Sequence, residues 1–184
     1  MQANDPMTRS LPSVMIRLAS PADVPSIAAL NVRSWQTAYR GHISDGFLNA
    51  LDPAQGVAWW SQVVVDPSVA VLVAVDSTSL IGFCSFLASR DDDAPHSTCE
   101  LATLYVDPGR LRAGCGTALV SAVIDMARER AFQELSLWVL SSNSVARAFY
   151  EAIGFTSDGH FKTDSRLGIS LCEVRYRRNL ASSA

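Results

Sequence analysis

The chain has 184 residues, of which 48% are hydrophobic, and a formal net charge of −3 at pH 7. This length suits one domain with a substantial core. The slightly acidic balance, without a long basic run, disfavours nucleic acid as a partner. No apolar stretch reaches the length of a transmembrane helix, and the first residues lack the apolar run of a signal peptide. We therefore expect a cytoplasmic protein that binds neither nucleic acid nor a membrane.

The sequence predicts one ordered domain between two flexible ends. Residues 1–13 are expected to form a disordered leader, with Met7 or Met15 as alternative starts of the chain. The domain is expected to span residues 14–178, and residues 179–184 are expected to form a flexible tail. No internal repeat or interdomain linker divides this span.

Hydrophobic periodicity predicts strands and helices along the whole domain. Ser20, Pro21 and Asp23 are typical of a helix start, and Gly41 is typical of a helix end. In chain order, the sequence predicts a strand (14–18), three helices (21–41, 47–51 and 53–64), three strands (69–75, 80–88 and 97–106), a helix ending near 131, a strand (134–140), a helix ending before 154 and two strands (155–161 and 169–176). This order indicates a mixed α/β fold with a sheet of about seven strands and helices on its faces.

The stretch from Leu104 to Val120 is the most informative part of the sequence. Its strand-forming residues end at Asp107-Pro108, since proline has no N–H for a strand ladder. Three glycines then permit close approach to the backbone, and apolar residues follow at helical spacing. Free N–H groups at a helix N-terminus bind anions, so the stretch predicts a phosphate site. A nucleotide-binding P-loop is disfavoured, because no Gly-Lys-Ser/Thr follows the glycines.

The cysteines and histidines indicate neither disulfides nor a metal site. The four cysteines form no CxxC pair and the three histidines are scattered, so we expect reduced thiols and no bound metal. Cys115 stands at the predicted helix start, where the pKa of a thiol can be lowered. A covalent role for Cys115 is nevertheless disfavoured, because no histidine lies near it in the sequence.

Two motifs occur together in the second half of the chain. The first is the loop Pro108–Gly116 (PGRLRAGCG), and the second is Asn143–Phe155 (NSVARAFYEAIGF). They resemble the acyl-CoA pyrophosphate loop and the second motif of the GNAT acetyltransferase superfamily, and residues 34–41 (SWQTAYRG) are similar to the opening helix of a bacterial branch. The resemblance extends over residues 16–177 and implies a mostly antiparallel sheet with a splayed central parallel pair and four to five helices. Leu111 departs from the pattern, since the family usually has arginine or glutamine there.

The resemblance implies acetyl-CoA as a co-substrate and no metal. The pyrophosphate is expected on backbone N–H groups of the loop, where each charge-assisted hydrogen bond contributes about 1.5–3 kcal/mol. The pantetheine is expected to pair like an added strand with the backbone of Leu104–Val106. The implied coenzyme-binding residues are Leu104, Tyr105, Val106, Arg112, Ala113, Gly114, Cys115, Gly116, Thr117, Asn143 and Ala146.

The same resemblance implies transfer of the acetyl group to a primary amine by direct attack in a ternary complex. Glu100 is the candidate base, because the even spacing to Leu104 places both residues on one face of the predicted strand. Tyr150 matches the family's general acid and follows Asn143 by seven residues, which is two helical turns. The alternatives are a solvent-facing strand residue for Glu100 and a core aromatic beside Phe149 for Tyr150.

The acceptor pocket is predicted only in outline. Trp35 and Tyr39 lie four residues apart on one helix face and are candidates for acceptor binding or, equally, for the core. The implied acceptor is the amine of a small molecule or peptide, and a homodimer is a further implied partner because family members are often dimers. The competing hypothesis is a non-catalytic acyl-CoA-binding module of the same fold, which the retention of Glu100 and Tyr150 disfavours.

Overall fold

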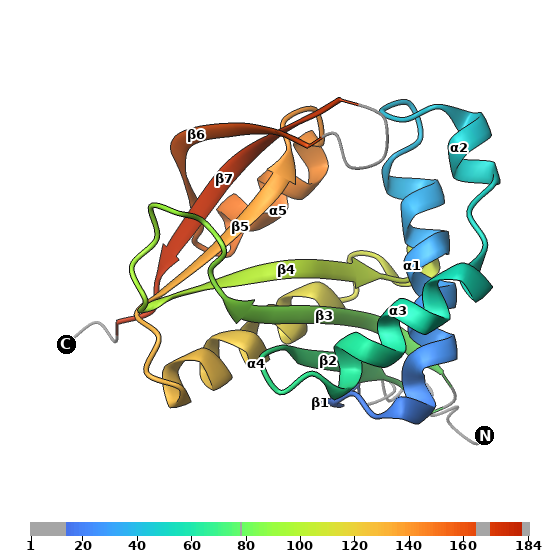
Figure 1. Cartoon of the computed structure of the whole chain (residues 1–184), viewed down its shortest axis with the longest axis horizontal. Coiled ribbons are helices and arrows are strands. Elements are labelled where there is room, and N and C mark those ends of the chain that lie inside the picture. The colour runs from blue at the N-terminus through green and yellow to red at the C-terminus, as the bar shows by residue number, and fades with distance from the viewer. Residues whose placement is uncertain (1–13, 78, 165–169, 182–184) are drawn as a thin grey trace, which may run out of the picture.

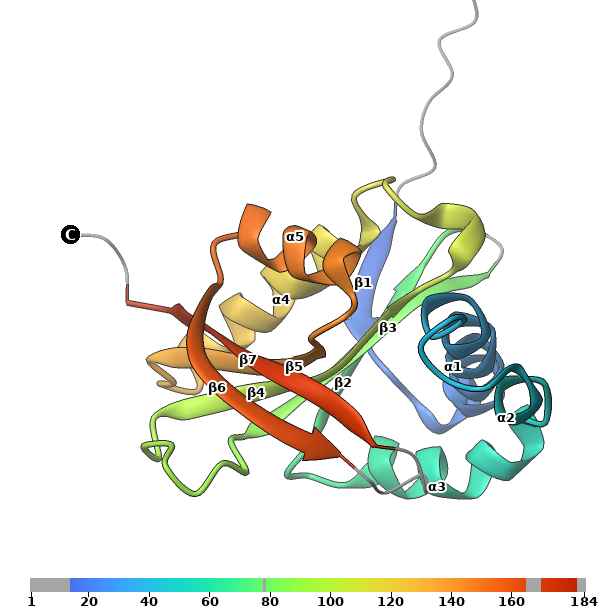
Figure 2. The ribbon, with the colours of Figure 1, turned by 90° about the horizontal axis from the view of Figure 1, so that it is seen from above.

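The protein is built on a seven-stranded sheet with helices on both faces (Figures 1 and 2). The computed structural model describes residues 14–77, 79–164 and 170–181. The strand order is β1-β2-β3-β4-β5-β7-β6. The strands are β1 (Met15–Leu18), β2 (Ala70–Val75), β3 (Leu80–Ala88), β4 (Thr98–Val106), β5 (Glu134–Leu140), β6 (Thr156–Asp164) and β7 (Leu171–Asn179). The helices are α1 (Val24–Ala38), α2 (Asp45–Asn49), α3 (Pro53–Val65), α4 (Cys115–Glu129) and α5 (Ser144–Ala152), with the 3₁₀ turns η1 (Pro21–Asp23) and η2 (Pro108–Arg110).

This architecture confirms the predicted fold class. In the described part of the chain, β4 and β5 are the parallel pair and the other neighbouring strands are antiparallel. The predicted first helix is divided into η1 and α1, and α1 ends at Ala38 rather than at Gly41. The N–H of Ser20 donates to the Asp23 carboxylate at 2.7 Å, which fixes the tight first turn.

Helices cover both faces of the sheet (Figure 2), and the apolar side chains form two cores. On one face, α4 packs its buried side, including Leu119 and Val123, against the strands, and α5 lies beside it. On the other face, Ile27 of α1 and Trp60 of α3 cover β2 and β3. Trp60 meets Phe83 edge to face, with ring centroids 5.1 Å apart. Burial of these faces removes apolar area from water. Each Å² buried stabilises the fold by about 25 cal/mol, and this free energy holds the helices to the sheet.

The parallel strands β4 and β5 separate after three paired residues. Their ladder runs from the pair Thr98–Glu134 to the pair Glu100–Ser136. Beyond it, β5 pairs with β7 up to Leu140, while β4 pairs with β3 up to Val106. Figure 1 shows the two strands diverging. The edge of β4 that faces β5 therefore carries backbone groups beyond Glu100 that the β5 ladder does not use.

A β-bulge interrupts β4 and changes which residues share a face. Leu101 pairs with Phe86 and Thr103 pairs with Ser85, so Ala102 is an extra residue on β4. Because side chains alternate along a strand, the extra residue reverses the alternation. Leu104 and Val106 consequently pack toward α4, as Leu101 does, while Tyr105 packs toward α1 and α3.

The ordered domain extends past the predicted boundary at residue 178. Strand β7 runs to Asn179, and Leu180 is only 2% exposed within the core on the α4 face. The Arg128 side chain also donates to the carbonyl of Leu180 at 2.9 Å. The prediction of a flexible tail from residue 179 is therefore wrong for these two residues, because apolar burial continues through Leu180. The predicted leader, 1–13, and residues 182–184 lie outside the described residues.

A buried arginine fixes the loop between β3 and β4 to the far half of the sheet. The Arg175 side chain on β7 is 2% exposed and contacts Asp91, Asp93 and Asp158, with its shortest contacts at 2.6 Å. Its hydrogen bonds to Asp93 lower the pKa of that carboxyl to about 2. Trp138 of β5 donates to Asp91 at 3.0 Å and so joins the same network.

We expect Arg175→Met to lower the Tm by about 5–10 °C at neutral pH, because Asp91, Asp93 and Asp158 lose the buried guanidinium that they share, and Arg177 still contacts only two of them. The pKa of Asp93 is depressed in the folded state, so its stabilising contribution is complete above the ordinary value of 3.8 and is lost toward pH 2. The Tm difference from the unsubstituted protein should therefore shrink between about pH 4 and pH 2. Thermal melts across this range test the prediction. The exposed pair of Arg40 and Asp45 provides the control, since Arg40→Met should change the Tm little.

Candidate active site

The predicted phosphate loop forms the N-terminus of α4. The Asp107 carboxylate accepts the Gly109 N–H at 2.9 Å, which shapes η2 at the end of β4. Arg112 and Gly114 then adopt positive φ angles of 61° and 80°, which turn the chain into α4. Ala118 donates to the carbonyl of Gly114 at 3.0 Å and so begins the helical ladder. The N–H groups of 115–117 precede that ladder and suit an anion at the positive end of the helix dipole.

Two loop glycines are needed for different physical reasons. Gly114 has a left-handed conformation, and a Cβ on it would meet no heavy atom within 4 Å. A side chain there would project into open space beside the N–H groups. A Cβ on Gly116 would lie 3.3 Å from the Phe149 ring, so this glycine permits α4 to pack closely on α5. Gly114 therefore allows the conformation of the loop, and Gly116 allows the close contact between α4 and α5.

The second motif forms α5 and begins with a cap. The Asn143 side chain accepts the Ala146 N–H at 3.0 Å, so these two predicted coenzyme-binding residues bond to each other at the N-terminus of α5. Tyr150, two turns along, packs between Phe149 and Phe155, with ring centroids 5.2 and 5.8 Å away. Burial raises its pKa well above the ordinary value, with smaller contributions from Tyr39 and Cys84. The Tyr150 hydroxyl is therefore protonated at neutral pH.

The predicted acceptor residues meet the side chain of Tyr105. Trp35 donates its indole N–H to the Tyr105 hydroxyl at 2.8 Å, and the Trp35 and Tyr39 rings lie 4.6 Å apart. Burial raises the pKa of both the Tyr39 and the Tyr105 phenol. Since indole can only donate, the Tyr105 oxygen accepts from Trp35. The Tyr150 phenol interacts electrostatically with those of Tyr39 and Tyr105, and we define Trp35, Tyr39, Tyr105 and Tyr150 as the aromatic cluster.

Glu100 lies on a different face from the one predicted. The bulge at Ala102 places it on the face of Tyr105 and not on that of Leu104, so the prediction from even spacing is wrong. Glu100 is also 4% exposed, which excludes the solvent-facing alternative. Arg90 holds both carboxylate oxygens, with contacts of 3.0 and 2.5 Å. Arg90 was not predicted, because an ion pair across a loop leaves no periodic signal in sequence.

Neither a reactive Cys115 thiolate nor a cluster of metal-binding side chains is seen in the described part of the chain. The Cys115 thiol is 2% exposed, and burial raises its pKa, so a reactive thiolate is not favoured. Among residues 14–77, 79–164 and 170–181, no group of three His, Cys, Asp or Glu side chains could hold a metal ion. Over the same residues, no helix is both long and apolar enough to span a membrane.

Comparisons with known proteins agree with this fold. The model of the acetyltransferase (GNAT) family matches residues 31–155. The uncharacterized N-acetyltransferase YuaI of Bacillus subtilis is 30% identical over 140 residues, covering 76% of this chain and 78% of that protein. A mycothiol acetyltransferase of Beutenbergia cavernae is 35% identical over 131 residues, covering 70% of this chain and 39% of that protein. PaiA N-acetyltransferase of Thermoplasma acidophilum, solved with coenzyme A, has a TM-score of 0.68 at 20% identity and covers 91% of this chain and 99% of its own.

Fold, site and similarity together define an acetyl-CoA-dependent acyltransferase. The chain belongs to the GNAT acetyltransferase family, since the family model matches more than half of its length. It spans about two fifths of the mycothiol acetyltransferase that it resembles.

Proposed function

We propose that this enzyme transfers the acetyl group of acetyl-CoA to the primary amine of a small molecule or peptide, by direct attack in a ternary complex. The observation that carries the proposal is that β4 and β5 separate after Glu100. The N-terminus of α4 follows the separated part of β4, and Tyr105 of the aromatic cluster lies on it. The backbone edge of Leu104–Val106 would pair with the pantetheine amides, and the N–H groups of 112–117 would hold the pyrophosphate. Asn143 and Ala146 complete this proposed donor site from the start of α5.

The chemistry requires a neutral amine next to the thioester. Removing the proton of a lysine-like amine near pH 7 costs about 4–5 kcal/mol, so a base is needed. We assign this role to Glu100, acting directly or through a water. The amine nitrogen then attacks the thioester carbon and the C–N bond forms. The C–S bond breaks to release the coenzyme thiolate, and the excess proton on the nitrogen passes to solvent or to that thiolate, which leaves a neutral amide. Trp35 and Tyr39 would contact the acceptor from α1.

Tyr150 would stabilise the leaving sulfur as a hydrogen-bond donor. An ordinary thiol has a pKa of about 8.5, whereas burial raises the pKa of Tyr150 above that of a free phenol. Complete transfer of the Tyr150 proton to the thiolate is therefore unfavourable. Donation of a hydrogen bond to the developing charge remains favourable, and it is strongest in a site that excludes water.

The test of the proposed function is thiol release from acetyl-CoA across a panel of amines, combined with thermal stabilisation by acetyl-CoA. We expect stabilisation in the absence of any amine, and thiol release that depends on specific primary amines. Stabilisation without turnover on any amine would support the non-catalytic module instead. Absence of both effects would contradict the proposed donor site as well. The similarity to mycothiol acetyltransferase supports the inclusion of small-molecule amines in the panel.

A second experiment tests the role of Glu100. We expect Glu100→Gln to lower kcat/KM by about 10²-fold near pH 7, the loss typical of an absent general base. The loss should become smaller as the pH approaches the amine pKa of about 10.4, where the acceptor is already neutral. Glu129→Gln at the end of α4 removes the same charge at a distance and should leave the pH–rate profile unchanged. A loss that is equal at every pH would indicate that Glu100 only holds Arg90 in place.

A further inference from the structure

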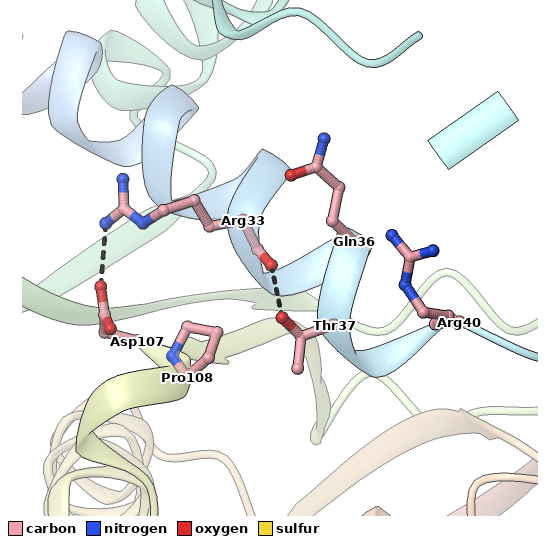
Figure 3. A pocket seen from close by; sticks show the side chains of 6 residues that line it. All are labelled: Arg33, Gln36, Thr37, Arg40, Asp107 and Pro108. Atoms are coloured by element: carbon pink, nitrogen blue, oxygen red, sulfur yellow. Dashed lines mark hydrogen bonds and ion pairs between the residues drawn. The ribbon is translucent and has the colours of Figure 1, made fainter. Parts of the chain in front are cut away.

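A pocket outside the aromatic cluster lies between α1 and the start of η2. Its volume is about 470 Å³, and Figure 3 shows the side chains that line it. Its lining residues come from the C-terminal part of α1, from the residues just after that helix, and from the chain that leads into the phosphate loop. They are Arg33, Gln36, Thr37, Arg40, Asp107 and Pro108. Gln36, Thr37 and Arg40 lie within the stretch 34–41 and Pro108 begins the loop motif, but the resemblance assigned no role to these individual side chains. The pocket is thus a separate cavity that adjoins the proposed donor site through Asp107 and Pro108.

The donors of this pocket are mainly cationic. Arg33 and Arg40 are 50% and 51% exposed, and their guanidinium groups are held by single carboxylates. Arg33 donates to Asp107 at 2.9 Å, and Arg40 lies 3.1 Å from Asp45. A guanidinium has five N–H groups, so such a pair orients the side chain and leaves further donors for a ligand.

The polar side chains beside the arginines also leave the pocket with more hydrogen-bond donors than acceptors. Gln36 uses one amide N–H on the carbonyl of Leu48 at 3.1 Å and has a second N–H. The only carboxylate among the lining residues, Asp107, already accepts from Arg33 and from the N–H of Gly109. Two cations therefore line the cavity, one paired with Asp107, whose oxygens are engaged, and the other with Asp45, which is not a lining residue. This arrangement suits a ligand group that accepts hydrogen bonds and carries negative charge.

We propose that this pocket binds an anionic group, a carboxylate or a phosphate, carried by one of the two substrates. The inference rests on the proposed function in naming those substrates, which are the amine acceptor and acetyl-CoA. An amine acceptor that supplies the anion would carry a carboxylate near its amine. A coenzyme held on the adjoining loop would place a phosphate against the same guanidinium groups.

The test compares affinities in the Arg40→Gln variant, because replacing Arg33 would also release Asp107 and disturb η2. Acceptor binding is measured by calorimetry on the coenzyme A-loaded protein, with amino acids and their carboxamides as matched pairs. Coenzyme binding is measured with acetyl-CoA and with acetylpantetheine, which lacks the phosphates. Arg130→Gln, at the far end of α4, removes the same charge and serves as the control.

We expect Arg40→Gln to weaken binding by about tenfold for one charged ligand and to spare its uncharged counterpart. Loss of the preference for amino acids over carboxamides identifies the acceptor as the source of the anion. Loss for acetyl-CoA but not for acetylpantetheine identifies the coenzyme. Affinities equal to those of Arg130→Gln in both series would overturn the inference. Failure of the proposed function would be seen separately, as binding without thiol release from any amine.

Discussion

Replacement of Tyr150 with phenylalanine is expected to lower kcat by about 10²-fold and to change the Kd for acetyl-CoA by less than about twofold. The phenyl ring can keep the packing against Phe149 and Phe155, so the variant removes the hydroxyl alone. That hydroxyl is proposed to act on the charge that develops on sulfur, which exists only as the C–S bond breaks. Steady-state kinetics and calorimetry with acetyl-CoA measure the two quantities separately.

The chain offers a matched control for the loss of a buried hydroxyl. Tyr176 on β7 is 1% exposed and lies outside the aromatic cluster, and its hydroxyl donates to Glu151 at 2.6 Å. Tyr176→Phe should lower stability and leave kcat nearly unchanged. A large loss of acetyl-CoA binding in Tyr150→Phe, or an equal loss of kcat in both variants, would show that Tyr150 is a structural residue.

Gly114→Val is expected to weaken acetyl-CoA binding by about 100-fold or more. Two effects combine in this variant. Its backbone has a φ of 80°, which a β-branched residue adopts only with strain of order 1–3 kcal/mol. The new side chain would also occupy the space in which the proposed pyrophosphate approaches the N–H groups. Calorimetric titration with acetyl-CoA measures the loss.

A second glycine provides a control that distinguishes backbone strain from obstruction of the coenzyme site. Gly159 in β6 has a φ of 83°, and a Cβ added to it, as at Gly114, would meet no heavy atom within 4 Å. Gly159→Val should therefore introduce similar backbone strain away from the loop and leave the Kd unchanged. Unaltered acetyl-CoA affinity in folded Gly114→Val would remove the loop from the coenzyme site.

Local patterns in the sequence were sufficient to predict most of the fold. The β-forming run before Asp107, the glycines after it and the helical periodicity after Gly116 each depend on neighbouring residues. Their prediction of a strand, a loop and α4 is confirmed. The cap at Asn143 is equally local, because its side chain bonds the N–H three residues ahead.

Features that depend on distant partners could not be predicted in the same way. The bulge at Ala102 exists only in the register with β3, so even spacing placed Glu100 on the wrong face. The bond from Trp35 to Tyr105 joins residues 70 positions apart, and it gives Tyr105 a side-chain contact where only its backbone was expected to matter. The roles of Glu100, Tyr105 and Tyr150 in the reaction stay predictions that the variants above address.

A crystal structure of the protein with bound acetyl-CoA tests the central claim most directly. We predict the pantetheine along the edge of β4 at Leu104–Val106, between β4 and β5. We also predict the pyrophosphate within hydrogen-bond distance of N–H groups in 112–117 and the thioester sulfur near the Tyr150 hydroxyl. Acetyl-CoA bound elsewhere, with the diverging strands and the N-terminus of α4 free of it, would contradict this account of the donor site.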